Sequence, residues 1–165
     1  MVKEQANRNP NPLVYNAIKD RGRMYLTVFR ELKERYGEDE AISVMRAASY
    51  AYGKPIGEAL ACFAPRDFAG MAEGFARSPD DGATFLPDVR RLDDTCLEVQ
   101  MMSCPIKDAW VEAGCSDAEI GTLLHCASAL DEATLETAGF AYEIELWSPG
   151  KEGCCLTRIT EKTGT

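Results

Sequence analysis

The sequence predicts an α+β fold in which a helical N-terminal half packs on an antiparallel sheet of about four strands, with two helices inserted between strands. Apolar residues recur at helical spacing up to about residue 77, and from about residue 83 several segments alternate apolar and polar residues as strands do. At 165 residues, 45% of them hydrophobic, the chain is long enough for one domain with a core and short for two. We therefore expect one domain over residues 1–165, with a helical part at 13–77 and a sheet-plus-helix part at 83–160.

The N-terminal half begins with a polar stretch, residues 1–12, that is rich in Asn and Pro and is expected to be a loosely ordered lead. The segment Leu13–Tyr36 carries apolar residues mainly three and four positions apart and is followed by Gly37, which predicts a helix that ends there.

Further helices are expected before residue 77. The first of them covers about Asp39–Tyr52, and because Gly53 and Pro55 interrupt the pattern, we expect a break and a separate helix from Ile56 to Pro65. A short helix over residues 67–77 and a turn at residues 78–82 complete this half.

The second half begins with a weak strand, Thr84–Arg91, in which Pro87 favours an edge position because proline cannot donate to a ladder. The next strand, Thr95–Cys104, ends at Pro105, which is expected to open a short helix reaching Ala113. A longer helix then runs to about residue 138, capped by residue 116 or 117. Two strands follow it, at residues 140–147 and 154–160, and the hairpin loop at residues 148–153 joins them.

Composition excludes several classes of partner. The net charge of −9 argues against nucleic acid, whose binding needs clustered Lys and Arg. The N-terminus lacks the apolar run of a signal peptide, and no stretch of about 18 apolar residues exists, so we expect a cytoplasmic protein with no membrane partner. The seven cysteines include no C-x-x-C pair, which favours reduced thiols over a disulfide framework or a zinc ribbon.

Asp131 is the most informative side chain, because helical spacing puts it in the middle of the apolar stripe of the long helix. Burying an unpaired carboxylate costs several kcal/mol, so the group either caps a neighbouring loop or strand end or belongs to a functional site. His125 falls on the opposite, polar face with Glu132 and Glu136, and so cannot partner Asp131 as a general base. Cys126 lies at the edge of the stripe, as a packing residue or a site residue.

Cys104 is the best nucleophile candidate, since it ends a strand immediately before the helix that Pro105 opens. The positive end of a helix lowers a thiol pKa and favours thiolate, although a buried packing cysteine is the alternative. Cys154 and Cys155 point to opposite faces of the last strand. If Ile159 marks the inward face, Cys155 shares it.

Three residues are candidates for substrate binding. Arg158 is a potential partner for the carboxylate of an acidic ligand, although strand alternation puts it opposite Cys155. Met102 belongs to a methionine pair that straddles both strand faces, and we expect it to line a pocket. Trp147 shares its strand face with glutamates, which indicates a ring near the sheet end or a pocket rim.

The run CPIKDAWVEAGCSDAEIGTLLHCASALDEATLETAGF, followed by a strand, PGKEGCC and another strand, resembles the L-2-amino-thiazoline-4-carboxylic acid hydrolase family. Broader relatives of that family include vinyl-reductase-like small-molecule-binding domains. The earlier stretch YGKPIGEALACF is also similar to the family's helical half, so the resemblance covers nearly the whole chain. It implies an α+β domain, hydrolysis of a small cyclic acid or amide-like bond, and four site residues: Cys104, Cys126, Asp131 and Cys155.

Two main hypotheses follow. In the first, Cys104 or Cys155 attacks a C=N or C=O carbon of a small heterocycle while Asp131 orients the leaving group or a water. No cofactor is firmly implied, and a divalent metal held by Cys and Asp is a variant of this hypothesis. In the second, the protein is a non-enzymatic small-molecule-binding or redox-sensing domain. Tyr25 and Tyr36 on the first helix are candidates for a homo-oligomer contact.

Overall fold

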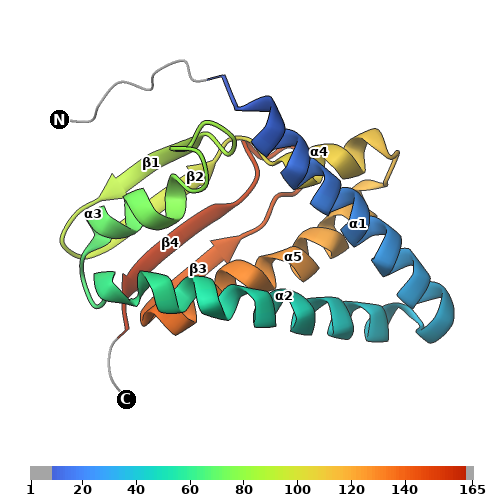
Figure 1. The fold of residues 1–165 in the computed structure, drawn as a ribbon, viewed down its shortest axis with the longest axis horizontal. Coiled ribbons are helices and arrows are strands. Elements are labelled where there is room, and N and C mark those ends of the chain that lie inside the picture. The colour runs from blue at the N-terminus through green and yellow to red at the C-terminus, as the bar shows by residue number, and fades with distance from the viewer. Residues whose placement is uncertain (1–8, 163–165) are drawn as a thin grey trace.

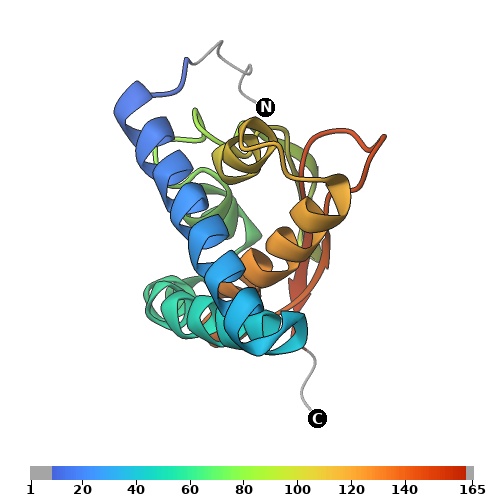
Figure 2. The ribbon, with the colours of Figure 1, turned by 90° about the vertical axis from the view of Figure 1, so that its right-hand side faces the viewer.

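The computed structural model describes residues 9–162 as an α+β fold with a four-stranded antiparallel sheet (Figure 1). The strand order is β1-β2-β4-β3, and the helices α4 and α5 lie in sequence between β2 and β3. In Figure 2, β3 and β4 lie at one side of the molecule and α1 at the other. The elements are α1 (Pro12–Tyr36), α2 (Glu38–Leu60), η1 (Ala61–Phe63), α3 (Phe68–Met71), η2 (Ala72–Ala76), β1 (Pro87–Leu92), β2 (Cys96–Met101), α4 (Pro105–Glu112), α5 (Asp117–Ala138), β3 (Phe140–Glu145) and β4 (Leu156–Glu161).

The first helix forms where its sequence signals place it. The Asn11 side chain accepts a hydrogen bond of 3.0 Å from the backbone N–H of Leu13, and Pro12 occupies the first turn, where its missing N–H costs nothing. Gly37 ends the helix with a φ of 90°. The predicted helix is therefore confirmed, whereas residues 1–8 of the predicted lead lie outside the described residues.

The predicted break in the next helix is wrong, because α2 continues through Pro55 to Leu60. Gly53 and Gly57 instead allow α2 to approach α5 closely. A Cβ added at Gly53 would lie 2.2 Å from the backbone oxygen of Leu130, and one at Gly57 would lie 2.4 Å from that of Thr134. The packing of two long helices thus offsets the backbone hydrogen bond that Pro55 removes.

The sheet follows the predicted pattern with shorter strands. β1 starts at Pro87 and occupies an edge, as predicted. In the central β2–β4 pair, buried Leu97 stands opposite buried Ile159. On the outer face, the Arg158 guanidinium lies 2.8 Å from the Glu98 carboxylate. The alternation that separates these two faces is why the helices cover only the apolar one.

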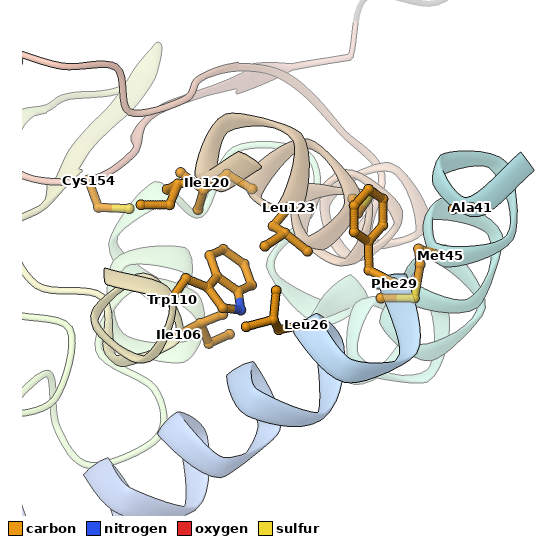
Figure 3. Packing of buried hydrophobic residues seen from close by; sticks show 11 residues of the cluster. Leu26, Phe29, Ala41, Met45, Ile106, Trp110, Ile120, Leu123 and Cys154 are labelled. Carbon is orange, nitrogen blue, oxygen red and sulfur yellow. The ribbon is translucent and has the colours of Figure 1, made fainter. Parts of the chain in front are cut away.

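Two apolar clusters form the core. The first joins α1, α2, α4 and the start of α5, and the indole N–H of its Trp110 donates a 2.7 Å hydrogen bond to the Gly22 carbonyl oxygen (Figure 3). The second joins the C-terminal half of α5 and the short helix α3 to the sheet, where the Phe68 and Phe140 ring centroids are 5.9 Å apart. Cys154, from the segment before β4, belongs to the first cluster.

Tyr25 makes a contact within this chain, because its hydroxyl lies 2.9 Å from the Ser49 hydroxyl between α1 and α2. Tyr36 is 65% exposed, and a homo-oligomer contact through it remains a prediction. Among the helices of residues 9–162, none combines the length and the apolar character needed to cross a bilayer.

Substitution Gly53→Ala tests the α2–α5 contact. Because the new methyl group would meet the Leu130 carbonyl, we expect the free energy of unfolding to fall by about 1–3 kcal/mol in urea denaturation. Gly121→Ala is the matched control, since a Cβ there meets nothing within 4 Å and should stabilise α5 by about 0.5–1 kcal/mol. Equal stabilisation by both substitutions would contradict the close contact.

Candidate active site

Cys104 occupies the N-cap position of α4, with Pro105 in the first helical turn. Backbone hydrogen bonds hold the segment before Cys104. The N–H groups of Met102 and Ser103 donate to the carbonyls of Leu86 and Phe85 at 3.2 and 3.0 Å. The Cys104 thiol is half-buried and packs against the first apolar cluster. The predicted position at a helix start is therefore confirmed, whereas the preceding strand ends at Met101, three residues earlier than predicted.

The cysteine pair 154–155 lies just before β4, beside the end of β2. Cys154 N–H donates to the Met101 oxygen at 2.7 Å, and Met101 N–H donates to the Cys155 oxygen at 2.9 Å. Gly153 precedes them with a φ of 66°, and a Cβ there would lie 2.6 Å from the Met101 oxygen, so only glycine fits.

Cys154 is the more deeply buried of the two, at 4% exposure, and its sulfur points toward Ile120 (Figure 3). Cys155 is half-buried and also packs against the first cluster. Strand alternation counted back from Ile159 put Cys155 on the inward face. It does not predict which of the two cysteines is more deeply buried, because β4 begins only at Leu156. The two sulfur atoms are 3.5 Å apart.

The thiols of Cys104 and Cys154 are joined by a hydrogen bond. A hydrogen bond from the Cys154 side chain lowers the pKa of Cys104, and the backbone N–H of Lys107 in the first turn of α4 lowers it further. Burial and the Asp108 carboxylate act in the opposite direction. The pKa of Cys154 is raised because it donates to Cys104, contacts Cys155 and is buried. The arrangement therefore favours a Cys104 thiolate that accepts a hydrogen bond from the Cys154 thiol.

Three neighbours of Cys104 were not identified from the sequence: Tyr15, Lys107 and Asp108. The Tyr15 hydroxyl donates a 2.6 Å hydrogen bond to Asp108, which raises the pKa of Tyr15 to about 12. The Lys107 ammonium lies 5.0 Å from the centroid of the Trp147 ring. Their i+3 and i+4 spacing from Cys104 marks Lys107 and Asp108 as first-turn residues, but nothing in the sequence connects Tyr15 to a site 93 residues away.

Asp131 lies in a different environment. No hydrogen bond or ion pair links its carboxylate to another residue in the range 9–162, so the capping interpretation has no support there. Burial raises the pKa of Asp131 to about 6, the positive charge of Arg21 opposes this, and Glu132 adds to it. Cys104 and Cys154 are not among the groups that shift the pKa of Asp131, and Asp131 is not among those that shift theirs, so no interaction joins Asp131 to these thiols.

Cys126 also stands apart from the other thiols. Its side chain is fully buried in the first cluster, and burial raises its pKa to about 11 against the effect of Arg46. This favours the packing interpretation of Cys126. His125 is exposed, as predicted, and its carbonyl oxygen accepts a 2.6 Å hydrogen bond from the Arg46 guanidinium.

The candidate substrate-binding residues are dispersed. Arg158 lies on the outer face of the sheet, 2.8 Å from Glu98 and 3.6 Å from Glu143. Met102 is 36% exposed and follows β2, two residues before Cys104, and half-buried Trp147 lies beside Lys107 of α4.

A recess of about 220 Å³ opens under the β3–β4 loop and reaches Cys154. Arg90 pairs with Glu152 at 2.8 Å on its wall, and Lys151 pairs with Glu145. Over the described range there is no group of three or more His, Cys, Asp or Glu side chains placed to hold a metal ion. The recess therefore offers charged side chains and a thiol, and is large enough for a small molecule.

The fold and the position of Cys104 together define an α+β protein with a cysteine at a helix N-terminus. The sequence pattern of the L-2-amino-thiazoline-4-carboxylic acid hydrolase family matches residues 18–148, and the chain belongs to that family. The name describes hydrolysis of a small heterocyclic acid. The matched segment contains Cys104, Cys126 and Asp131 and ends before Cys154 and Cys155. No curated protein and no solved structure matches the chain.

Substitution Asp131→Asn tests the environment of this carboxylate. Its folded pKa, about 6, is above the ordinary 3.8, so its protonated form favours folding below pH 4 and that contribution is lost as pH rises through 6. We expect Asn to raise the free energy of unfolding by about 1–3 kcal/mol at pH 8 and by less at pH 4.5. Urea denaturation at both pH values measures this, and an equal effect at both would contradict the raised pKa.

Proposed function

We propose that the protein is a cysteine-dependent hydrolase that acts on an activated C=N or C=O carbon of a small heterocyclic acid, with Cys104 as the nucleophile. The single observation that carries the proposal is the position of the Cys104 sulfur, between the first turn of α4 and the Cys154 thiol. Both partners stabilise a thiolate, which is the reactive form of cysteine. Family membership supports the reaction class.

The proposed reaction has two stages. Cys104 forms a C–S bond to the electrophilic carbon, the ring nitrogen takes up a proton from water, and the amine leaves once its C–N bond breaks. Water then attacks the same carbon, and Cys104 departs as a thiolate that again accepts the hydrogen bond from Cys154. We give Asp131 no part in these steps, because no hydrogen bond or charge interaction joins it to Cys104 or Cys154.

An acidic substrate would suit the recess under the β3–β4 loop. Arg90 and Lys151 line this recess, and each is held by a carboxylate on an exposed surface, Glu152 and Glu145. Surface ion pairs of this kind contribute little stability, so a substrate carboxylate can replace either glutamate at small cost. Cys154 on the same recess would then lie between the bound acid and Cys104.

Substitution Cys104→Ser tests the nucleophile. With L-2-amino-thiazoline-4-carboxylate as substrate, we expect turnover to fall by roughly 1,000-fold or more, while Cys62→Ser, at an exposed cysteine, keeps the activity of the unaltered protein. Turnover that survives Cys104→Ser would refute the role of Cys104. Binding of this compound without its consumption by the unaltered protein would instead favour a small-molecule-binding domain.

Substitution Cys154→Ala tests the hydrogen bond to Cys104. The rate should rise with pH as the Cys104 thiolate forms, and removing the donor should move this rise to higher pH, because the donor lowers the pKa of Cys104. The pH dependence of kcat/KM for both proteins gives the comparison. A simple loss of folded protein would lower kcat/KM equally at all pH values without moving the profile.

A further inference from the structure

Three of the seven thiols are in contact in one row. The Cys154 side chain hydrogen-bonds to Cys104, and its sulfur is 3.5 Å from that of Cys155. The remaining cysteines, Cys62, Cys96, Cys115 and Cys126, have no sulfur neighbour within the described part of the chain. The proposed hydrolysis uses Cys104 as the nucleophile and Cys154 as its hydrogen-bond donor, and it gives no role to Cys155 or to the contact between Cys154 and Cys155.

We propose that Cys104, Cys154 and Cys155 form a thiol relay that reduces small hydroperoxides and stores the oxidising equivalents as a disulfide. This activity goes beyond the proposed hydrolysis and does not depend on it. The geometry that carries it is the contact of half-buried Cys104, at the N-terminus of α4, with the buried Cys154 sulfur, which is itself next to the sulfur of Cys155. Two adjacent thiols can resolve an oxidised cysteine faster than it is oxidised further.

The first step transfers oxygen to Cys104. Its thiolate attacks the terminal oxygen of the hydroperoxide, the O–O bond breaks, and the alkoxide or hydroxide that leaves takes a proton from water. Cys104 becomes a sulfenic acid, so its sulfur is oxidised by two electrons and the peroxide is reduced by two.

The second step forms the disulfide. The Cys154 sulfur attacks the sulfur of the Cys104 sulfenic acid, the S–O bond breaks, and the hydroxyl leaves as water with the proton of the Cys154 thiol. Cys155, 3.5 Å from Cys154, can then attack the Cys154 sulfur and release Cys104 as a thiolate. Two molecules of a small thiol reduce either disulfide by exchange and become a disulfide themselves, which completes the cycle.

The three cysteines differ in their exposure to solvent and in the groups that surround them. Cys104 and Cys155 are half-buried, whereas Cys154 is only 4% exposed. The recess of about 220 Å³ is lined by Cys154 and is large enough for the small thiol that reduces its disulfide. The Lys107 backbone N–H at the first turn of α4 stabilises negative charge on Cys104, the atom that attacks first.

The test oxidises the purified, fully reduced chain with one equivalent of hydrogen peroxide, without any hydrolase substrate. We expect two of the seven thiols to disappear, and mass spectrometry to locate a disulfide between Cys154 and either Cys104 or Cys155. Dithiothreitol should restore both thiols. Cys104 should be oxidised at least about tenfold faster than exposed Cys62, which is the internal control because it lacks a sulfur neighbour.

Variants separate the relay from a lone reactive thiol. Cys104→Ser should remove the fast loss of thiols, and Cys154→Ala should leave a Cys104 sulfenic acid that dimedone traps. Sulfenic acid that persists on Cys104 in the unaltered protein, or oxidation of Cys62 as fast as Cys104, would overturn the relay. If the unaltered protein forms the disulfide but never consumes L-2-amino-thiazoline-4-carboxylate, the relay stands and the hydrolase proposal fails.

Discussion

The central β2–β4 ladder is the constraint on which the thiol cluster depends. Its last two hydrogen bonds join Met101, the last residue of β2, to Cys154 and Cys155, which precede the start of β4. Because Met101 is three residues before Cys104, the same bonds fix the distance between the start of α4 and the segment before β4. Gly153 makes this possible, since a side chain there would collide with the Met101 oxygen. Two segments about 50 residues apart thus meet through backbone geometry, and their side chains follow.

Burial acts on Cys126, Asp131 and Cys104 alike, and their partners decide the direction in which each pKa moves. Cys126 is fully buried with only the charge of Arg46 to oppose burial, and its pKa is raised to about 11. Asp131 has only the opposing charge of Arg21, and its pKa is raised to about 6. Cys104 receives a hydrogen bond from Cys154 and the N–H of Lys107, and these two effects outweigh burial. Specific donors aimed at the sulfur, more than exposure to solvent, therefore distinguish Cys104 from the other buried groups.

Local sequence signals were sufficient for most of the fold and for one end of the site. Pro105 after an alternating segment placed Cys104 at a helix N-terminus, and Pro87 placed β1 at the sheet edge. The signals failed where a contact between distant segments overrides local preference. Gly53 predicts a helix end from its own neighbours, but in the fold it is the point where α2 meets α5. The depth of Cys154 likewise depends on the turn at Gly153, which strand alternation does not include.

The two proposed activities have one physical cause, because a thiolate that attacks a carbon electrophile also attacks a peroxide oxygen. A donor that stabilises the anion of Cys104 increases the fraction of reactive sulfur for both reactions. If that donor were a backbone N–H alone, oxidation would continue to acids that thiols cannot reduce. Because the donor is itself a thiol, oxidation of Cys104 ends in a reversible disulfide. Cys154 therefore activates the nucleophile and protects it, and while the disulfide includes Cys104 no thiolate is left for hydrolysis.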